Sequence, residues 1–119
     1  MKKECSSPYI HINNKSYPCS VSFVMDLIGG RWKAVILCFL RNGEKRFGEL
    51  RKELHFITET TLSIQLKQLE EDRLITKRTI GIKPPLKTIY SLSPLGQSFI
   101  PLLDEINKWG HSIIDHKCP

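Results

Sequence analysis

Residues 58–72 read TETTLSIQLKQLEED, and their pattern is the strongest indication of the fold in the sequence. Leu62, Leu66 and Leu69 recur at helical spacing and form one narrow apolar stripe. Thr58 is suited to cap the first turn, and Glu59 complements the helix dipole there. We therefore expect a helix that begins at Thr58, ends near Asp72 and buries one side against a core.

The face opposite the leucine stripe is rich in hydroxyl and amide groups. On a helical wheel the outward arc contains Thr60, Thr61, Ser63, Ile64, Lys67 and Gln68, with Gln65 on its flank. Hydroxyls and amides hydrogen-bond to base edges, and an isoleucine can meet a thymine methyl. A solvated helix face usually mixes glutamate with lysine, but here no acid occurs before Glu71. We interpret the arc as a DNA-reading face, and a plain polar surface is the alternative.

Apolar periodicity predicts further helices before this stretch. Residues 20–28 show helical spacing, with Ser20 suited to cap them, and residues 31–40 are apolar on most sides, which is typical of a buried helix. Residues 48–54 predict a short helix with Leu50 and Leu54 facing inward. A short helix followed by a polar-faced helix is the order of a helix-turn-helix.

A basic hairpin follows the polar-faced helix. Residues 74–79 and 87–92 are rich in isoleucine, threonine and tyrosine and predict two strands, joined by a loop with two prolines and a glycine. The hairpin carries several cations and no acid, so its loop can follow the phosphates or enter the minor groove. The candidate DNA-binding cations are Arg46, Lys67, Lys77, Lys83 and Lys87.

The last predicted helix starts at Ser93-Pro94, a serine cap followed by a proline at the first helical position. It carries a long apolar stripe from Leu95 to Ile113. The sequence thus predicts a mainly α fold with a small antiparallel β-hairpin, a winged helix-turn-helix. We expect a flexible arm over 1–17, the winged helix-turn-helix with its dimerisation helices over 18–114, and a tail over 115–119.

Composition agrees with a small nucleic-acid-binding protein. The chain has 119 residues, a formal net charge of +6 and 40% hydrophobic residues, which suggests one soluble domain with an anionic partner. The first residues lack the apolar run of a signal peptide, and no stretch is long enough to span a bilayer. We expect a cytoplasmic protein with reduced thiols, no cofactor and no membrane partner.

Several separate motifs recur in the order seen in the HxlR-type winged helix-turn-helix regulators, which the chain resembles over about residues 18–114. They are DLIGGRWK at 26–33 with the preceding Cys19, RFGEL at 46–50, LKQLE at 66–70, YSLSPLG at 90–96 and WG at 109–110. The resemblance implies a DNA-binding homodimer joined through the first and last helices. The implied interface residues are Val21, Val24, Phe99, Leu102, Leu103, Ile106, Trp109 and Ile113.

The chain departs from this family at two positions. The family usually has glycine where Arg73 stands, after the recognition helix, so we expect Arg73 to adopt a left-handed backbone conformation that arginine tolerates poorly. Ile64 replaces a residue that is commonly polar. Ile64 is therefore interpreted either as a contact to a thymine methyl group or as a residue that is simply exposed to solvent.

The chain has four cysteines, whose spacing matches no zinc site. Cys19 precedes the first helix, whose N-terminus favours the reactive thiolate. Some members of the family sense oxidants or electrophiles through a cysteine at this place, so Cys19 is a candidate sensor, and a structural cysteine is the alternative. We expect Cys38 to be inert core, and Cys5 or Cys118 to be candidate resolving thiols. His111, His116 and Cys118 have spacings that do not bring three metal ligands together.

The sequence lacks the fingerprints of the common enzyme classes, and a thiol reductase would need a base or second thiol near Cys19. We therefore predict a sequence-specific regulator that binds duplex DNA and is not an enzyme. Its two recognition helices should read a near-palindromic operator. The alternative is a winged-helix module that binds protein without DNA.

Overall fold

The computed structural model describes residues 10–117. The chain forms two compact units: the N-terminal unit ends at Arg31, and the C-terminal unit begins at Trp32. The stretch that we expected to be one domain, 18–114, spans parts of both units. None of the helices in the described residues is both long enough and apolar enough to cross a membrane.

The N-terminal unit consists of a hairpin and a helix. Strands β1 (Ile10–Ile12) and β2 (Lys15–Tyr17) pair antiparallel. They are joined by Asn13 and Asn14, whose φ angles of 53° and 65° suit the tight two-residue hairpin turn. This hairpin lies inside the stretch that we had expected to be an arm, of which residues 1–9 lie outside the described residues.

Helix α1 (Ser20–Ile28) follows the hairpin and packs against β2. The hydroxyl of Tyr17 donates a hydrogen bond of 2.7 Å to Oδ2 of Asp26, and the Tyr17 ring meets the edge of Phe23 at a centroid distance of 5.4 Å. The N-cap is Cys19, not Ser20 as we expected, and no side-chain hydrogen bond caps the helix. The backbone N–H of Phe23 instead bonds to the carbonyl of Cys19 at 3.2 Å.

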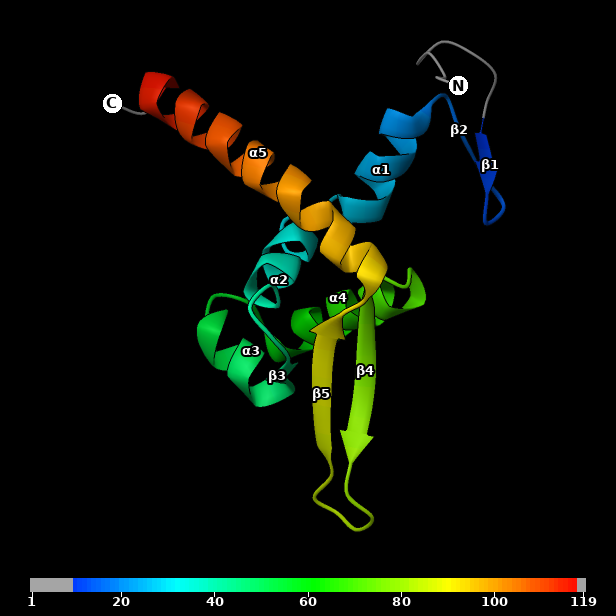
Figure 1. Cartoon of the computed structure of the whole chain (residues 1–119), viewed down its shortest axis with the longest axis vertical. Coiled ribbons are helices and arrows are strands. Elements are labelled where there is room, and N and C mark those ends of the chain that lie inside the picture. The colour runs from blue at the N-terminus through cyan, green and yellow to red at the C-terminus, as the bar shows by residue number, and fades with distance from the viewer. Residues whose placement is uncertain (1–9, 118–119) are drawn as a thin grey trace. The chain divides into compact units, whose positions relative to one another are not determined.

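The C-terminal unit combines helices with a small sheet, as Figure 1 shows. The sheet has the order β3-β5-β4, and both neighbouring pairs are antiparallel. This is the predicted mainly α winged fold. The elements are α2 (Lys33–Phe39), β3 (Lys45–Arg46), α3 (Phe47–Glu53), α4 (Glu59–Glu71), β4 (Ile75–Ile80), β5 (Lys87–Leu92) and α5 (Pro94–Lys117).

The leucine stripe of α4 lies at the centre of the core. Leu62, Leu66 and Leu69 are 0%, 1% and 0% exposed, which confirms the predicted buried side. Helices α2 and α3 contribute further fully buried side chains, among them Ile36 and Leu50. Packing of this kind stabilises each helix far more than its intrinsic propensity does.

The expectation that Cys38 is buried core was wrong. Its neighbours Ile36 and Leu37 are fully buried, whereas Cys38 is exposed. Helix α2 therefore buries one side and exposes the other, although its sequence is apolar on both. Cys38 behaves as a surface thiol of the C-terminal unit.

Helix α4 ends in a paired hydrogen-bond motif that requires a left-handed residue. The N–H of Leu74 bonds to the carbonyl of Leu69, and the N–H of Arg73 bonds to the carbonyl of Glu70, each at 3.0 Å. This pattern is the Schellman C-terminus, in which glycine usually takes the left-handed position. Arg73 takes it here with φ of 62°, as the family resemblance implied.

Ser93 anchors the start of α5 to this corner. Its Oγ donates to the carbonyl of Arg73 at 2.6 Å and accepts from the N–H of Gly96 at 3.0 Å. A Cβ at Gly96 would lie 2.1 Å from the carbonyl oxygen of Leu74, so only glycine allows this approach. Helix α5 then continues to Lys117, three residues beyond the predicted boundary at 114.

Candidate nucleic-acid interface

The face of α4 opposite the buried leucines is open to solvent in this chain. Thr60, Ser63, Ile64 and Lys67 are exposed, and Ile64 keeps 49% of its surface accessible. Three further predicted residues on this face are half-buried, namely Thr61, Gln65 and Gln68. The exposed side chains of this face are therefore free to meet a ligand, and the half-buried ones are only partly accessible.

The N-terminus of α4 is fixed by Thr58. Its Oγ1 accepts from the N–H of Thr61 at 3.1 Å and donates to Oγ1 of Thr61 at 2.8 Å. The predicted cap is thus confirmed. Because the Thr61 hydroxyl oxygen accepts in this arrangement, its own hydrogen is left to donate to an acceptor in front of the helix.

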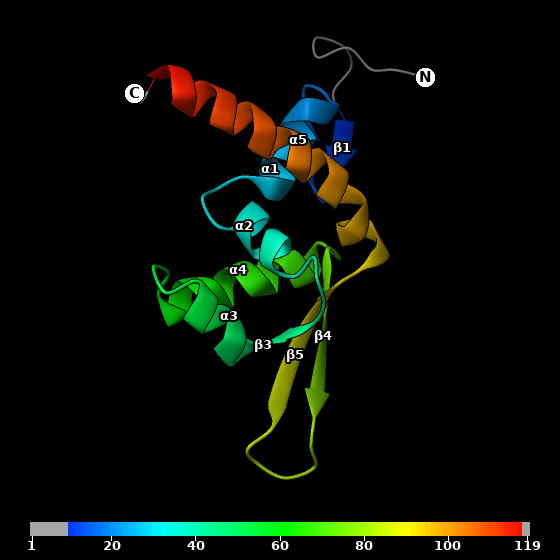
Figure 2. The ribbon, with the colours of Figure 1, turned by 60° about the vertical axis from the view of Figure 1, so that its left-hand side comes forward.

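The wing, defined here as β4, β5 and the loop 81–86, projects away from the helices of the C-terminal unit in both ribbon views (Figures 1 and 2). Lys77, Lys83 and Lys87 are exposed on it and form no ion pair within the described residues. Arg78 differs, because its Nη2 lies 2.8 Å from Oε2 of Glu44. Unpaired lysines are the cations most available to phosphates.

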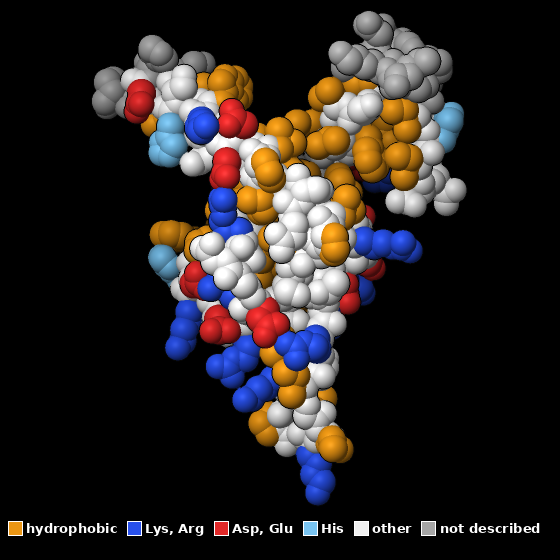
Figure 3. Space-filling view, viewed as in Figure 1, with side chains coloured by type: hydrophobic (Ala, Val, Ile, Leu, Met, Phe, Trp, Pro, Cys, Tyr) orange, Lys and Arg blue, Asp and Glu red, His pale blue; other side chains and the backbone are white. Residues whose placement is uncertain are grey.

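Charge is distributed unevenly over the C-terminal unit. Figure 3 shows lysine and arginine side chains over the part that contains β3, α3 and the wing, with acidic side chains among those of β3 and α3. Lys67 is exposed on α4 and also lacks an ion pair in the described part of the chain. Lys67 therefore adds a positive charge without an acidic partner to the exposed side of α4, which suits contact with a polyanion.

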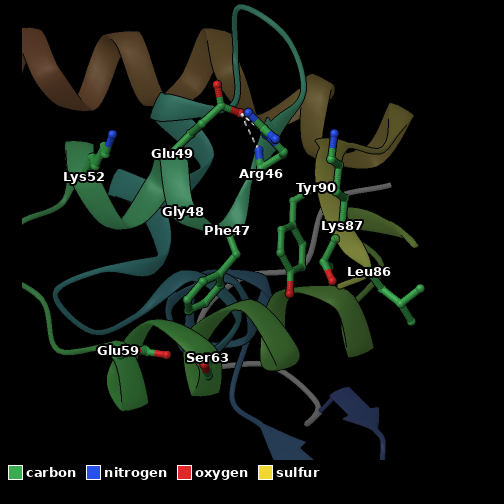
Figure 4. Close-up of a pocket in the computed structure, with 11 residues that line it drawn as sticks. Arg46, Phe47, Gly48, Glu49, Lys52, Glu59, Ser63, Leu86, Lys87 and Tyr90 are labelled. Carbon is green, nitrogen blue, oxygen red and sulfur yellow. Dashed lines mark hydrogen bonds and ion pairs between the residues drawn. The ribbon is translucent and has the colours of Figure 1, made fainter. Parts of the chain in front are cut away.

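A cleft of about 600 Å³ separates the helix-turn-helix from the wing. Figure 4 shows its walls: α3 on one side, α4 with Ser63 below, and β5 with Tyr90 opposite. Sequence reasoning had placed Arg46, Ser63 and Lys87 near DNA, and the structure brings all three to this cleft. Lys52, in the basic last turn of α3, also lines the cleft and was not among the predicted residues.

Tyr90 forms part of the cleft wall and is only 8% exposed. Burial raises the pKa of its hydroxyl, and the negative charge of Glu70 raises it further. The hydroxyl therefore remains protonated at neutral pH. In Figure 4 it points toward α4, where it is able to donate a hydrogen bond.

Arg46 interacts with Glu49 of the same chain through both its backbone and its guanidinium. The N–H of Arg46 donates to Oε1 of Glu49 at 2.8 Å, and its guanidinium Nε lies 3.8 Å from the same oxygen. That backbone hydrogen bond lowers the pKa of Glu49, with help from the charges of Arg46 and Lys45. Glu49 therefore fixes the start of α3. Its carboxylate also competes with a DNA phosphate for the guanidinium of Arg46.

The predicted interface residues differ in exposure. On α5, Leu102, Ile106 and Trp109 are 49%, 44% and 69% exposed, whereas Phe99 is only 9% exposed and belongs to the core of its own unit. Leu103 and Ile113 on α5 are half-buried. In the N-terminal unit, Val21 is 56% exposed and Val24 is half-buried.

The described residues contain no group of three or more histidine, cysteine, aspartate or glutamate side chains that is able to hold a metal ion. Cys19 is 4% exposed and Cys38 is exposed, while Cys5 and Cys118 lie outside the described residues.

Comparison with known proteins gives consistent matches. The model of the HxlR-like helix-turn-helix family matches residues 27–118. The HTH-type transcriptional regulator YdzF of Bacillus subtilis (strain 168) is 45% identical over 98 residues, which cover 81% of this chain and 88% of YdzF.

Solved structures are similar as well. That of the HTH-type transcriptional regulator ytcD is 38% identical with a TM-score of 0.74, and the match covers 81% of this chain and 97% of that one. A structure of the redox regulator HypR in its reduced form is 35% identical with a TM-score of 0.73, covering 77% of this chain and 90% of that one.

Proposed function

The chain belongs to the HxlR-like helix-turn-helix family of transcriptional regulators, and we propose that it binds duplex DNA sequence-specifically as a homodimer. The observation that supports this most is the two-sided character of α4. Its leucines are fully buried, while Thr60, Ser63 and Lys67 on the opposite face are exposed. A helix of this kind can enter a major groove without losing any contact to its own core.

Affinity and discrimination come from different residues in this proposal. Lys67, Lys77, Lys83 and Lys87 neutralise phosphates, because no carboxylate in the described chain pairs with them. The hydroxyl and amide groups of α4, carried by Thr60, Thr61, Ser63 and Gln68, read base edges. Ile64 is exposed enough to meet a thymine methyl.

Homodimerisation is supported by the apolar surface of α5. Leu102, Ile106 and Trp109 leave about half or more of their surface exposed, and monomeric proteins rarely leave such side chains together on one helix. Val21 and Met25 of α1, 56% and 60% exposed, supply a second apolar surface. Paired recognition helices then bind half-sites about one helical turn apart, in a near-palindromic operator.

Selection of binding sites from a random duplex pool tests this function. We expect enrichment of a near-palindrome, and an affinity that falls with salt at a log–log slope of about −0.9 for each phosphate neutralised. A purified dimer that retains no duplex at low ionic strength contradicts DNA binding and leaves the protein-binding winged helix as the function.

We also propose that Cys19 senses oxidants or electrophiles. It is the N-cap of α1, where the helix dipole favours the thiolate, and the redox regulator HypR is similar in structure. Because Cys19 is only 4% exposed, its reaction requires a local opening of the N-terminal unit. Modification at this position would displace α1, which belongs to the proposed dimer interface, and so change the geometry of the dimer.

Alkylation kinetics followed by mass spectrometry, and DNA binding before and after oxidation, test the sensor; labelling of Cys19 no faster than that of free cysteine contradicts a reactive thiolate. The variant should retain Cys19 alone, with serine at the other cysteines, and the matched control should retain only the exposed Cys38. We expect oxidant to abolish DNA binding in the Cys19 variant and to leave the Cys38 variant unaffected. Equal DNA binding by the oxidised and reduced Cys19 variant contradicts the sensor without affecting the proposed DNA binding.

A further inference from the structure

The tip of the wing is apolar, although its strands are basic. Ile82 is 98% exposed, and Ile80 and Leu86 on either side are 40% and 49% exposed. Pro84 and Pro85 belong to the same loop, 81–86, whose only charged residue is Lys83. Figure 3 shows these hydrophobic side chains gathered around the end of the wing.

The loop that carries these side chains closes on itself. Gly81 has φ of +114°, and a Cβ placed on it would lie 3.2 Å from Cδ2 of Leu86 and 3.8 Å from the carbonyl oxygen of Lys83. Leu86 therefore lies against the backbone of Gly81 and closes the base of the loop. The two prolines restrict φ, so the loop loses little conformational freedom when it binds. Ile82 remains outside this closure, directed to solvent.

We propose that the tip of the wing is a wedge that enters the DNA minor groove, where Ile82 inserts against a base step and partly unstacks it. This inference rests on the proposed DNA binding. Apolar side chains carry no hydrogen-bonding groups for base edges, but isoleucine and proline are among the residues that minor-groove proteins insert between bases. Burial of Ile82 between sugars and bases removes from water a side chain that this chain leaves almost fully exposed.

Charge favours nucleic acid over an apolar protein surface as the occupant. Lys83 lies within the tip, and Lys77 and Lys87 lie on the two strands behind it, all without ion pairs in the described residues. The minor groove is lined by phosphates on both sides, so a narrow apolar tip with cations around it matches that groove in charge. Pyrimidine–purine steps unstack most readily, so we expect one of them under the tip.

The test uses the full chain and a duplex that the wild type selects from a random pool. 2-Aminopurine placed at the step under the tip reports unstacking by its fluorescence, and a salt series reports phosphate contacts. We expect binding of the wild type to raise the fluorescence. Ile82→Ser should lose most of this rise and about 10-fold in affinity, with an unchanged salt slope. Lys83→Ala is the matched control: it should keep the rise and reduce the salt slope by about 0.9.

The two proposals fail in different ways. Ile82→Ser is not expected to alter folding because Ile82 makes almost no buried contact, and circular dichroism checks this. If Ile82→Ser binds and unstacks the duplex as the wild type does, the wedge is wrong while the DNA-binding function stands. If the wild type binds no duplex, both proposals are wrong. Loss of a protein partner by Ile82→Ser, with DNA binding intact, also overturns the wedge.

Discussion

The guanidinium of Arg41 holds the carboxylate of Asp104 through two hydrogen bonds, Nη1 to Oδ1 at 2.6 Å and Nη2 to Oδ2 at 3.0 Å. Arg41 lies just after α2 and Asp104 lies in α5, so the pair fastens the helix with the exposed apolar stripe to the helix-turn-helix core. The hydrogen bond and the charge of Asp104 raise the pKa of Arg41, and Arg41 in turn lowers the pKa of Asp104.

This pair predicts how stability depends on pH. Because the folded-state pKa of Asp104 is lowered, its contribution is complete above the ordinary carboxyl pKa of about 4 and is lost as pH falls through the lower folded value. We expect Asp104→Asn to lower the melting temperature slightly at pH 7 and to have a smaller effect at an acidic pH well below about 4. The control is Glu105→Gln, which removes only the exposed pair with Lys108 and should change nothing. An equal effect at both pH values contradicts the assignment.

Arg73 predicts a stabilising substitution. Its φ of 62° strains any side chain with a Cβ, so Arg73→Gly should raise the free energy of unfolding by about 1 kcal/mol. Asp72→Gly is the matched control, because Asp72 has φ of −82° and gains nothing from glycine. Urea denaturation measures both, and a destabilised Arg73→Gly would show that contacts of the arginine outweigh the strain.

Gly96 predicts a destabilising substitution. A methyl group there meets the carbonyl oxygen of Leu74, and overpacking of this kind costs about 1–3 kcal/mol. Gly110→Ala in the same helix is the control, since nothing lies within 4 Å of its added Cβ and alanine is the better helix former. Thermal unfolding of the two variants should therefore shift in opposite directions.

One substitution on α4 should change the base preference of the protein, and one on the wing should change only its overall affinity for DNA. Gln68→Ala removes an amide from the reading face of α4, so we expect it to relax base preference at one position by about 1–3 kcal/mol. Lys87→Ala removes a phosphate contact and should weaken all duplexes alike, with a salt slope reduced by about 0.9. Competition binding with a panel of single-substitution duplexes measures both, and uniform losses in both variants contradict this division.

The dimer should depend on α5. Trp109 is 69% exposed, so Trp109→Glu should leave the fold of the C-terminal unit intact but place a charge in the apolar stripe. We expect this variant to sediment as a monomer and to lose at least 10-fold in operator affinity, because two half-sites are no longer bound together. Lys108→Glu, next to it and outside the stripe, is the control. A dimeric Trp109→Glu places the interface elsewhere.

The helices and the wing could be predicted from sequence because their signals are local. The leucine spacing of α4, the cap at Thr58 and the Ser93-Pro94 start each specify a boundary without reference to other segments. Arg73 was predicted on a different basis, because the resemblance to the family, which usually has glycine at this position, implied a left-handed backbone there.

The exposure of Cys38 and the position of the cleft depend on tertiary packing, whereas the N-terminal hairpin has a local signal within a polar segment. The exposure of Cys38 depends on which side of α2 faces α4 and α5, and an apolar sequence on both sides does not decide it. The hairpin over residues 10–17 had a readable signal, the Asn13-Asn14 turn between alternating residues, but its polar composition suggested an arm. The cleft joins α3, α4 and β5, which only the folded chain brings together.

Amide NMR of the labelled protein, titrated at low ionic strength with the selected duplex, tests whether the exposed face of α4 binds DNA. We predict that the resonances of Thr60, Ser63 and Lys67 and those of the wing loop shift together, while those of the far end of α5 around His111 do not. If the duplex binds without shifting the resonances of the exposed face of α4, α4 is not the helix that reads DNA. If the protein binds no duplex at all, the proposed DNA binding is wrong.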